Sequence, residues 1–105
     1  MDAFAQLEAT VADRLRADPG SSYIASLAAK GRAKIAQKVG EEAVETVIAA
    51  MGDDCDALIG EASDLVFHLT VLLAARGLGW ADIAAELARR DGLSGHAEKA
   101  MRPPD

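Results

Sequence analysis

The chain has 105 residues, of which half are hydrophobic, only 4% are aromatic and 23 are alanine. This composition favours a single domain of closely packed helices and argues against a β-sandwich or barrel. The net charge of −6 at neutral pH excludes non-specific binding to nucleic acid or to anionic membranes as the main function.

The spacing of apolar residues predicts helices separated by glycine- and aspartate-rich turns. The expected elements are residues 3–17, a short helix carrying Tyr23 that ends at Gly31, and residues 32–51, 55–75 and 80–91. No segment alternates as a strand would. The expected fold class is therefore all-α. It is a single domain over residues 1–105, built as a bundle of about four to five helices round two long antiparallel helices, with a polar tail at 94–105.

The compartment is expected to be the cytoplasm. No uninterrupted apolar run approaches the roughly 18 residues of a membrane span. The first residues lack the basic flank of a signal peptide. The single cysteine, Cys55, forms neither an intramolecular disulfide nor a zinc site, and has no neighbouring base to activate it. We therefore expect a soluble protein with reduced thiols and no membrane partner.

Negative charge is concentrated in the two long helices. From residue 39 to residue 75 there is no lysine or arginine, yet there are eight acidic residues. Three of them, Asp53, Asp54 and Asp56, belong to the turn and a helix start, where acids complement the helix dipole. The other five form narrow acidic strips on otherwise apolar helices: Glu41, Glu42, Glu45, Glu61 and Asp64.

Four of these carboxylates are expected to face one another across the antiparallel helices: Glu42, Glu45, Glu61 and Asp64. Buried carboxylates without basic neighbours need a cation or a proton. Four oxygen ligands without histidine or cysteine suit Mg²⁺, or alternatively Mn²⁺. Two alternatives stay open at this point. One is a solvated acidic face without metal, and the other is a di-iron centre, which would favour Glu-x-x-His over the Glu61-x-x-Asp64 found here.

A basic segment precedes the acids, in a stretch from residue 19 to residue 40 that has no acidic residue. Its four cations are Lys30, Arg32, Lys34 and Lys38. They either extend the metal site as a phosphate-binding surface or include only an ordinary Lys38–Glu42 surface pair. His68 is likewise open to two interpretations, a residue of the site or a core histidine hydrogen-bonded to a carbonyl.

The string Glu41-Glu42-x-x-Glu45, followed after 15 residues by Glu61-x-x-Asp64, resembles the EExxE…ExxD signature of the all-α nucleotide pyrophosphatases, the MazG-like superfamily. The flanking strings Lys38-Val39-Gly40 and Phe67-His68, with the tail segment 94–99, resemble the phosphoribosyl-ATP pyrophosphohydrolases within it. The resemblance extends from about residue 4 to residue 102. One departure is Phe67, which stands where tyrosine is common in that family.

The resemblance implies Mg²⁺-dependent hydrolysis of phosphoribosyl-ATP to phosphoribosyl-AMP and pyrophosphate, the second step of histidine biosynthesis. It implies that the metal ligands are Glu42, Glu45, Glu61 and Asp64. It implies that Glu41 and Glu45 are catalytic, with Glu41 either a ligand to a second metal or a base that orients water. The residues expected to hold substrate phosphates are Lys30, Arg32, Lys34, Lys38 and Lys99, with Arg102 as a further candidate.

A homodimer is expected from the apolar surface of the long helices as well as from the resemblance. Val44, Ile48, Phe67 and Val71 would face solvent in a lone hairpin. Two other functions stay open: a housecleaning nucleoside triphosphate pyrophosphatase on the same scaffold, and a metal-free helical interaction module. Release of pyrophosphate from different nucleotides separates the first of these, and the absence of any response to Mg²⁺ identifies the second.

Overall fold

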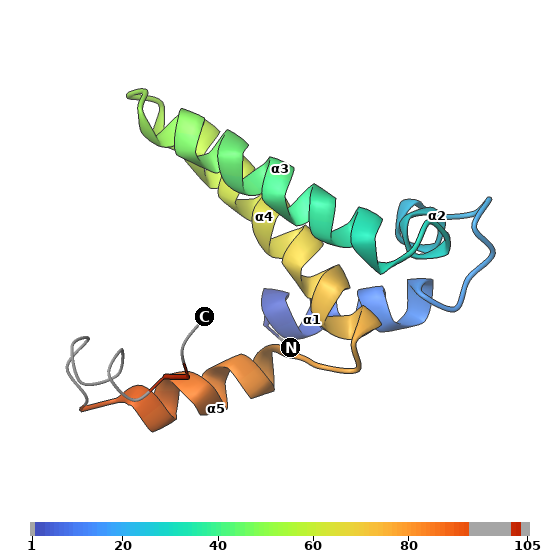
Figure 1. Cartoon of the computed structure of the whole chain (residues 1–105). Coiled ribbons are helices and arrows are strands. Elements are labelled where there is room, and N and C mark those ends of the chain that lie inside the picture. The colour runs from blue at the N-terminus through green and yellow to red at the C-terminus, as the bar shows by residue number, and fades with distance from the viewer. Residues whose placement is uncertain (1, 93–101, 104–105) are drawn as a thin grey trace.

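The computed structural model describes residues 2–92 and 102–103 of the chain, and every regular element in these residues is an α-helix (Figure 1). The helices are α1 (Ala3–Arg14), α2 (Tyr23–Ala29), α3 (Arg32–Ala50), α4 (Cys55–Ala75) and α5 (Trp80–Arg90). The all-α class and the two long antiparallel helices predicted from the sequence are confirmed. The polar tail from residue 94 lies almost entirely outside the described residues.

Local side-chain and backbone chemistry sets the helix ends. Ser22 begins α2 by accepting a hydrogen bond from the Ala25 N–H at 3.0 Å. Gly31, with a φ of 99°, separates α2 from α3 in a conformation that favours glycine. Asp54 caps α4 by accepting from the N–H groups of Asp56 and Ala57. Because these contacts join residues that are close in the chain, the helix ends that they define can be predicted from the sequence.

The first helix ends earlier than the sequence indicates, at Arg14 and not at residue 17. The N–H groups of Arg16 and Ala17 bond to carbonyls only three residues back, Asp13 and Arg14, at 3.3 and 3.0 Å. This tighter i to i+3 pattern closes the last turn before the Asp18-Pro19-Gly20 break. The prediction was therefore wrong by about one turn, because apolar spacing alone does not distinguish these two hydrogen-bond patterns.

The core lies at one end of the α3–α4 hairpin, where α1 and α2 cover it (Figure 1). Its buried members come from all four of these helices: Val11, Ile24, Leu27, Ile35 and Val71. Val71 is completely buried within the chain, which corrects the expectation that it needs a second copy to cover it. Phe67 is half-buried against the same core. The reason is that α1 packs along α4, which no feature of the local sequence indicates.

Helix α5 extends from the base of the hairpin, apart from α3 and α4 (Figure 1). Trp80 connects it to the rest of the chain. The Trp80 backbone N–H donates to Glu8 Oε2 at 3.0 Å, and its indole Nε1–H donates to Thr70 Oγ1 at 2.9 Å. A carboxylate at the start of a helix also complements the helix dipole. Glu8 on α1 therefore caps α5 from a distance of 72 positions in the sequence.

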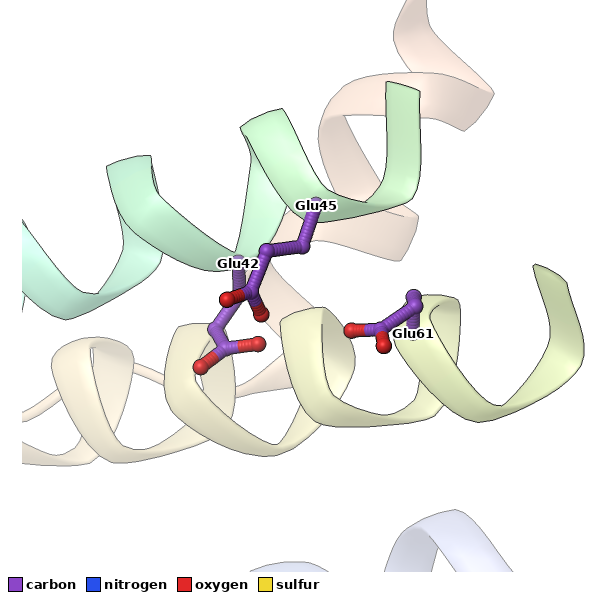
Figure 2. Close-up of side chains that lie close together, drawn as sticks. All are labelled: Glu42, Glu45 and Glu61. Carbon is purple, nitrogen blue, oxygen red and sulfur yellow. The ribbon is translucent and has the colours of Figure 1, made fainter. Parts of the chain in front are cut away.

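The far end of the hairpin is apolar and uncovered. Its exposed side chains, each between 59% and 79% accessible, are Val44, Val47, Ile48, Met51 and Ile59. By length and composition α4 is also one helix that is apolar enough to cross a membrane. Core helices of soluble proteins pass the same test, and α4 carries Glu61 on the side that meets α3 (Figure 2).

Candidate active site and metal centre

Three carboxylates converge between α3 and α4. Glu42 and Glu45 lie on adjacent turns of α3 and Glu61 lies opposite them on α4, with one oxygen of each within 4.8 Å of the others (Figure 2). The sequence places them there because residues three apart share a helix face and a short turn makes the helices antiparallel. Glu42 is buried, Glu61 is partly buried and Glu45 is exposed, so the cluster opens to solvent on the Glu45 side.

Glu42 carries the unfavourable electrostatics of this cluster. It is only 7% exposed, and its Oε2 is buried without a hydrogen-bond partner among the described residues. The close carboxyl of Glu45, with which it can share a proton, raises the pKa of Glu42, and burial raises this pKa further. The nearest cation is Lys38, whose Nζ lies 3.7 Å from Glu42 Oε1. Lys38 lies on one side of the cluster, and it leaves the negative charges of Glu45 and Glu61 without a positive partner in the part of the chain that the structure describes. This charge imbalance favours binding of a cation in the cluster.

Glu41 lies outside this group and faces a different set of partners. Its Oε1 accepts a hydrogen bond from Gln37 Nε2 at 3.1 Å, and its Oε2 lies 3.4 Å from Lys38 Nζ. The hydrogen bonds from Gln37 and then Lys38 lower the pKa of Glu41. Sequence reasoning missed Gln37, although its position four residues before Glu41 was a signal for this contact.

Asp64 does not join the three converging carboxylates. It is exposed, one turn beyond Glu61 on α4, and its backbone carbonyl accepts a hydrogen bond from His68 Nδ1 at 2.8 Å. The other ring nitrogen of His68, Nε2, lies 2.8 Å from the hydroxyl of Tyr23. His68 is therefore a buried histidine bonded to a carbonyl, the second of its two sequence interpretations. Tyr23 was not among the candidate site residues, because no helical spacing links it to His68, 45 positions later in the chain.

The basic residues differ in how closely they approach the acids. Lys38 contacts both Glu41 and Glu42. Lys34 is partly buried one turn earlier, and its charge contributes to the lowered pKa of Glu41. Lys30 and Arg32 are exposed at the junction of α2 and α3. Lys99 lies outside the described residues, and Arg102 belongs to the short described segment 102–103.

The carboxylate cluster and its flanks coincide with a known family pattern. Residues 4–91 match the family described as phosphoribosyl-ATP pyrophosphohydrolase. This match includes α1 from its second residue, all of α2 to α5, and the carboxylates of the motif, Glu41, Glu42, Glu45, Glu61 and Asp64.

The chain belongs to the phosphoribosyl-ATP pyrophosphohydrolase family.

Individual relatives agree with this assignment over nearly the whole chain. A phosphoribosyl-ATP pyrophosphatase of Sphingopyxis alaskensis is 69% identical over 98 residues, which cover 92% of this chain and 90% of the relative. The protein of the same name from Rhizorhabdus wittichii is 64% identical, over 93% of this chain and 92% of the relative. The one from Zymomonas mobilis is 56% identical, over 97% of this chain and 95% of the relative. The family resemblance inferred from the sequence is thereby confirmed.

A member of the phosphoribosyl-ATP pyrophosphohydrolase family needs to neutralise a polyphosphate, and this cluster has the chemistry to do so. Carboxylate oxygens are the preferred ligands of hard divalent cations. The three converging groups offer such oxygens. The unpartnered Oε2 of Glu42 is a ligand atom to which a cation would bind. An acidic cluster able to bind a metal is thus present at the position of the family's sequence signature.

Proposed function

We propose that the chain hydrolyses phosphoribosyl-ATP to phosphoribosyl-AMP and pyrophosphate in histidine biosynthesis, in the cytoplasm, with Mg²⁺ as cofactor. The observation that carries the proposal is the convergence of Glu42, Glu45 and Glu61, with one buried oxygen left without a partner. Asp64 completes the ligand set from the next turn of α4, and Mn²⁺ is the alternative metal. Bound there, a divalent cation would neutralise phosphate charge and polarise a phosphoryl oxygen.

The remaining residues of the site act on the substrate's position and on water. Lys34 and Lys38 add positive charge beside the carboxylates and hold phosphate oxygens. Glu41 keeps a lowered pKa and is therefore ionised at neutral pH, which suits a group that orients a water molecule. Glu45, the exposed member of the cluster, is the second group within reach of a substrate that enters from solvent.

Release of pyrophosphate from a panel of nucleotides tests the proposal. Phosphoribosyl-ATP is expected to be cleaved fastest in the presence of Mg²⁺, with ATP, dUTP and dCTP much slower. Faster cleavage of an ordinary triphosphate would assign a housecleaning function to the same scaffold. No cleavage of any nucleotide, with no response to Mg²⁺, would leave only a helical interaction module.

Binding of Mg²⁺ is expected to stabilise the protein, and less so at low pH. A ligand at 100 times its dissociation constant adds about 2.7 kcal/mol to the free energy of unfolding, which raises the melting temperature by about 10 °C or more in a domain of this size. The pKa of Glu42 is raised above 4.5, so this group takes up a proton as the pH falls from neutrality. Protonation removes a ligand and also relieves the charge repulsion of the metal-free state.

Melting curves with and without Mg²⁺ at pH 7.5 and pH 5 measure this effect. The difference caused by Mg²⁺ should shrink at the lower pH. K⁺ at equal ionic strength serves as the control for general screening. A shift of equal size at both pH values, or one reproduced by K⁺, would contradict binding at these carboxylates.

The apolar end of the hairpin supports a homodimer as the functional state. Val44, Val47, Ile48, Met51 and Ile59 form an uncovered apolar surface on α3 and α4. Light scattering is expected to give about twice the 10.9 kDa mass of one chain. Ile48→Asp should convert the protein to a monomer, because a charge in an apolar interface is left without a partner.

Leu78→Asp is the matched control for the dimer, because Leu78 is also an exposed apolar residue but lies in the loop before α5. It should leave the mass unchanged. A monomeric wild-type protein at micromolar concentration would rule out the dimer.

A further inference from the structure

The aromatic ring of Tyr23 is half exposed and yet held on several sides. Tyr23 is 52% accessible at the first turn of α2. Its ring stacks on Phe67 with centroids 6.3 Å apart and an interplanar angle of 28°, and it meets the edge of His68 at 5.7 Å. Exposed side chains ordinarily keep their rotational freedom, and fixing one costs conformational entropy. A fixed and exposed ring is a preorganised surface.

The hydroxyl of Tyr23 is fixed as firmly as its ring. His68 Nδ1 lies 2.8 Å from the Asp64 carbonyl oxygen, which can only accept, so Nδ1 carries the hydrogen. In the neutral imidazole the other nitrogen, Nε2, is then an acceptor, and the Tyr23 hydroxyl donates to it at 2.8 Å. The contact spans 45 positions of the sequence and ties α2 to α4 beside the ligand-bearing turn.

The ring lies beside α4 close to the carboxylate cluster, because its hydroxyl contacts His68 and His68 contacts the backbone carbonyl of Asp64. Asp64 follows Glu61 by one turn of α4, so the bonded chain from Tyr23 through His68 ends beside the turn that carries Glu61. The aromatic face of Tyr23 therefore borders the turn of α4 that carries the proposed metal ligands Glu61 and Asp64.

The other aromatic residues of the chain are engaged elsewhere. Of its four aromatic residues, Phe4 and Trp80 pack against each other at 6.2 Å where α1 meets α5. Phe67 is half-buried beneath Tyr23. Among the described residues, Tyr23 is thus the one aromatic ring that is both beside the cluster and open to a ligand.

We propose that the exposed face of Tyr23 stacks on the adenine base of the substrate, so that Tyr23 is a base-binding residue. This inference rests on the proposed function, since it takes the phosphates to lie at the carboxylates. Stacking on an aromatic side chain suits a purine and is indifferent to its hydrogen-bonding edge, and it is lost with a ligand that has no base. Phe67 beneath the ring and His68 at the hydroxyl act as positioning residues.

Nuclear magnetic resonance tests the contact directly, because selective isotope labelling of tyrosine leaves the ring of Tyr23, the chain's single tyrosine, as the one labelled side chain. The full-length protein with Mg²⁺ is titrated with ATP and, separately, with inorganic tripolyphosphate, which has the phosphates without the base. Both ligands should shift the backbone amides of Glu42 and Glu61. Only ATP should shift the Tyr23 ring signals, through the ring current of the stacked adenine.

The outcomes separate this inference from the proposed function. Amide shifts with both ligands but an unmoved Tyr23 ring with ATP would overturn the stacking alone. A Tyr23 shift of equal size with tripolyphosphate would also overturn it. If neither ligand moves the amides of Glu42 and Glu61, the proposed function fails and the stacking fails with it. Ring signals that respond to protein concentration and not to ATP would assign the ring to contact with a second copy.

Two substitutions at Tyr23 separate the contribution of the ring to ATP binding from that of the hydroxyl. Tyr23→Leu should weaken ATP binding by about 5- to 100-fold, the usual loss when a stacked aromatic side chain is removed, and leave tripolyphosphate binding within about twofold. Tyr23→Phe keeps the ring and loses the bond to His68, so ATP binding should stay within about threefold of wild type. Phosphoribosyl-ATP should show the same order in KM. Equal losses for both ligands, or in both variants, would indicate a purely structural role.

Discussion

Glu42→Gln is expected to abolish most of the turnover of phosphoribosyl-ATP and to make the metal-free protein more stable. The side chain is buried, has an oxygen without a partner, and has a pKa raised by Glu45 and by burial. A neutral amide of the same shape removes the repulsion and adds about 1–3 kcal/mol to the free energy of unfolding. Loss of a ligand that supports several kcal/mol of charge stabilisation lowers turnover by about 100-fold or more.

Turnover at saturating Mg²⁺ and thermal melting without metal are the two measurements for Glu42→Gln. Asp53→Asn is the matched control, because Asp53 is an exposed acid in the turn between α3 and α4 and should change neither quantity. Asp64→Asn should also lose most of its activity while folding normally, with little change in stability because Asp64 is exposed. Near-normal turnover of either Glu42→Gln or Asp64→Asn would contradict the ligand assignment of that residue.

Lys34→Ala is expected to raise the KM for phosphoribosyl-ATP by about 10- to 150-fold, the range of one charge-assisted hydrogen bond to a phosphate. Every pyrophosphatase on this scaffold needs the carboxylates, so they do not distinguish this substrate from an ordinary triphosphate. The distinguishing group is the additional ribosyl phosphate, which needs a cation away from the metal. Lys34 suits this role because it is partly buried near the acids, whereas Lys38 is already paired with Glu41 and Glu42.

Steady-state kinetics on phosphoribosyl-ATP and on ATP measures whether Lys34 affects the binding of the first substrate selectively. The KM for ATP should change much less than the KM for phosphoribosyl-ATP. Arg14→Ala, which removes an exposed cation at the end of α1, is the control and should affect neither. Deletion of residues 94–105 applies the same test to Lys99 and to the rest of the tail. Equal effects on both substrates, or none, would refute a selective role for Lys34.

The candidate site was predicted from the sequence in part. Glu42, Glu45 and Glu61 converge as expected, because helical spacing and a short turn are enough to bring them to one seam. Asp64 follows Glu61 by three residues, as Glu45 follows Glu42, but Asp64 is exposed and lies outside the group of three carboxylates. Spacing defines which face of a helix a residue occupies. The rotation of α4 about its own axis decides which residues of that face lie in the interface with α3.

The helices of the described residues and most of their ends could be predicted from the sequence, because they depend on contacts between near neighbours. The family could be predicted from the identity and spacing of the motif residues. Caps at Ser22 and Asp54 and the glycine at position 31 are local devices that a linear pattern displays. Three contacts could not be predicted from the linear pattern: α1 buries Val71, Tyr23 bonds to His68, and Glu8 caps α5. Each of these contacts joins residues far apart in the chain. Their geometry follows from the simultaneous packing of many core side chains, which no single segment encodes.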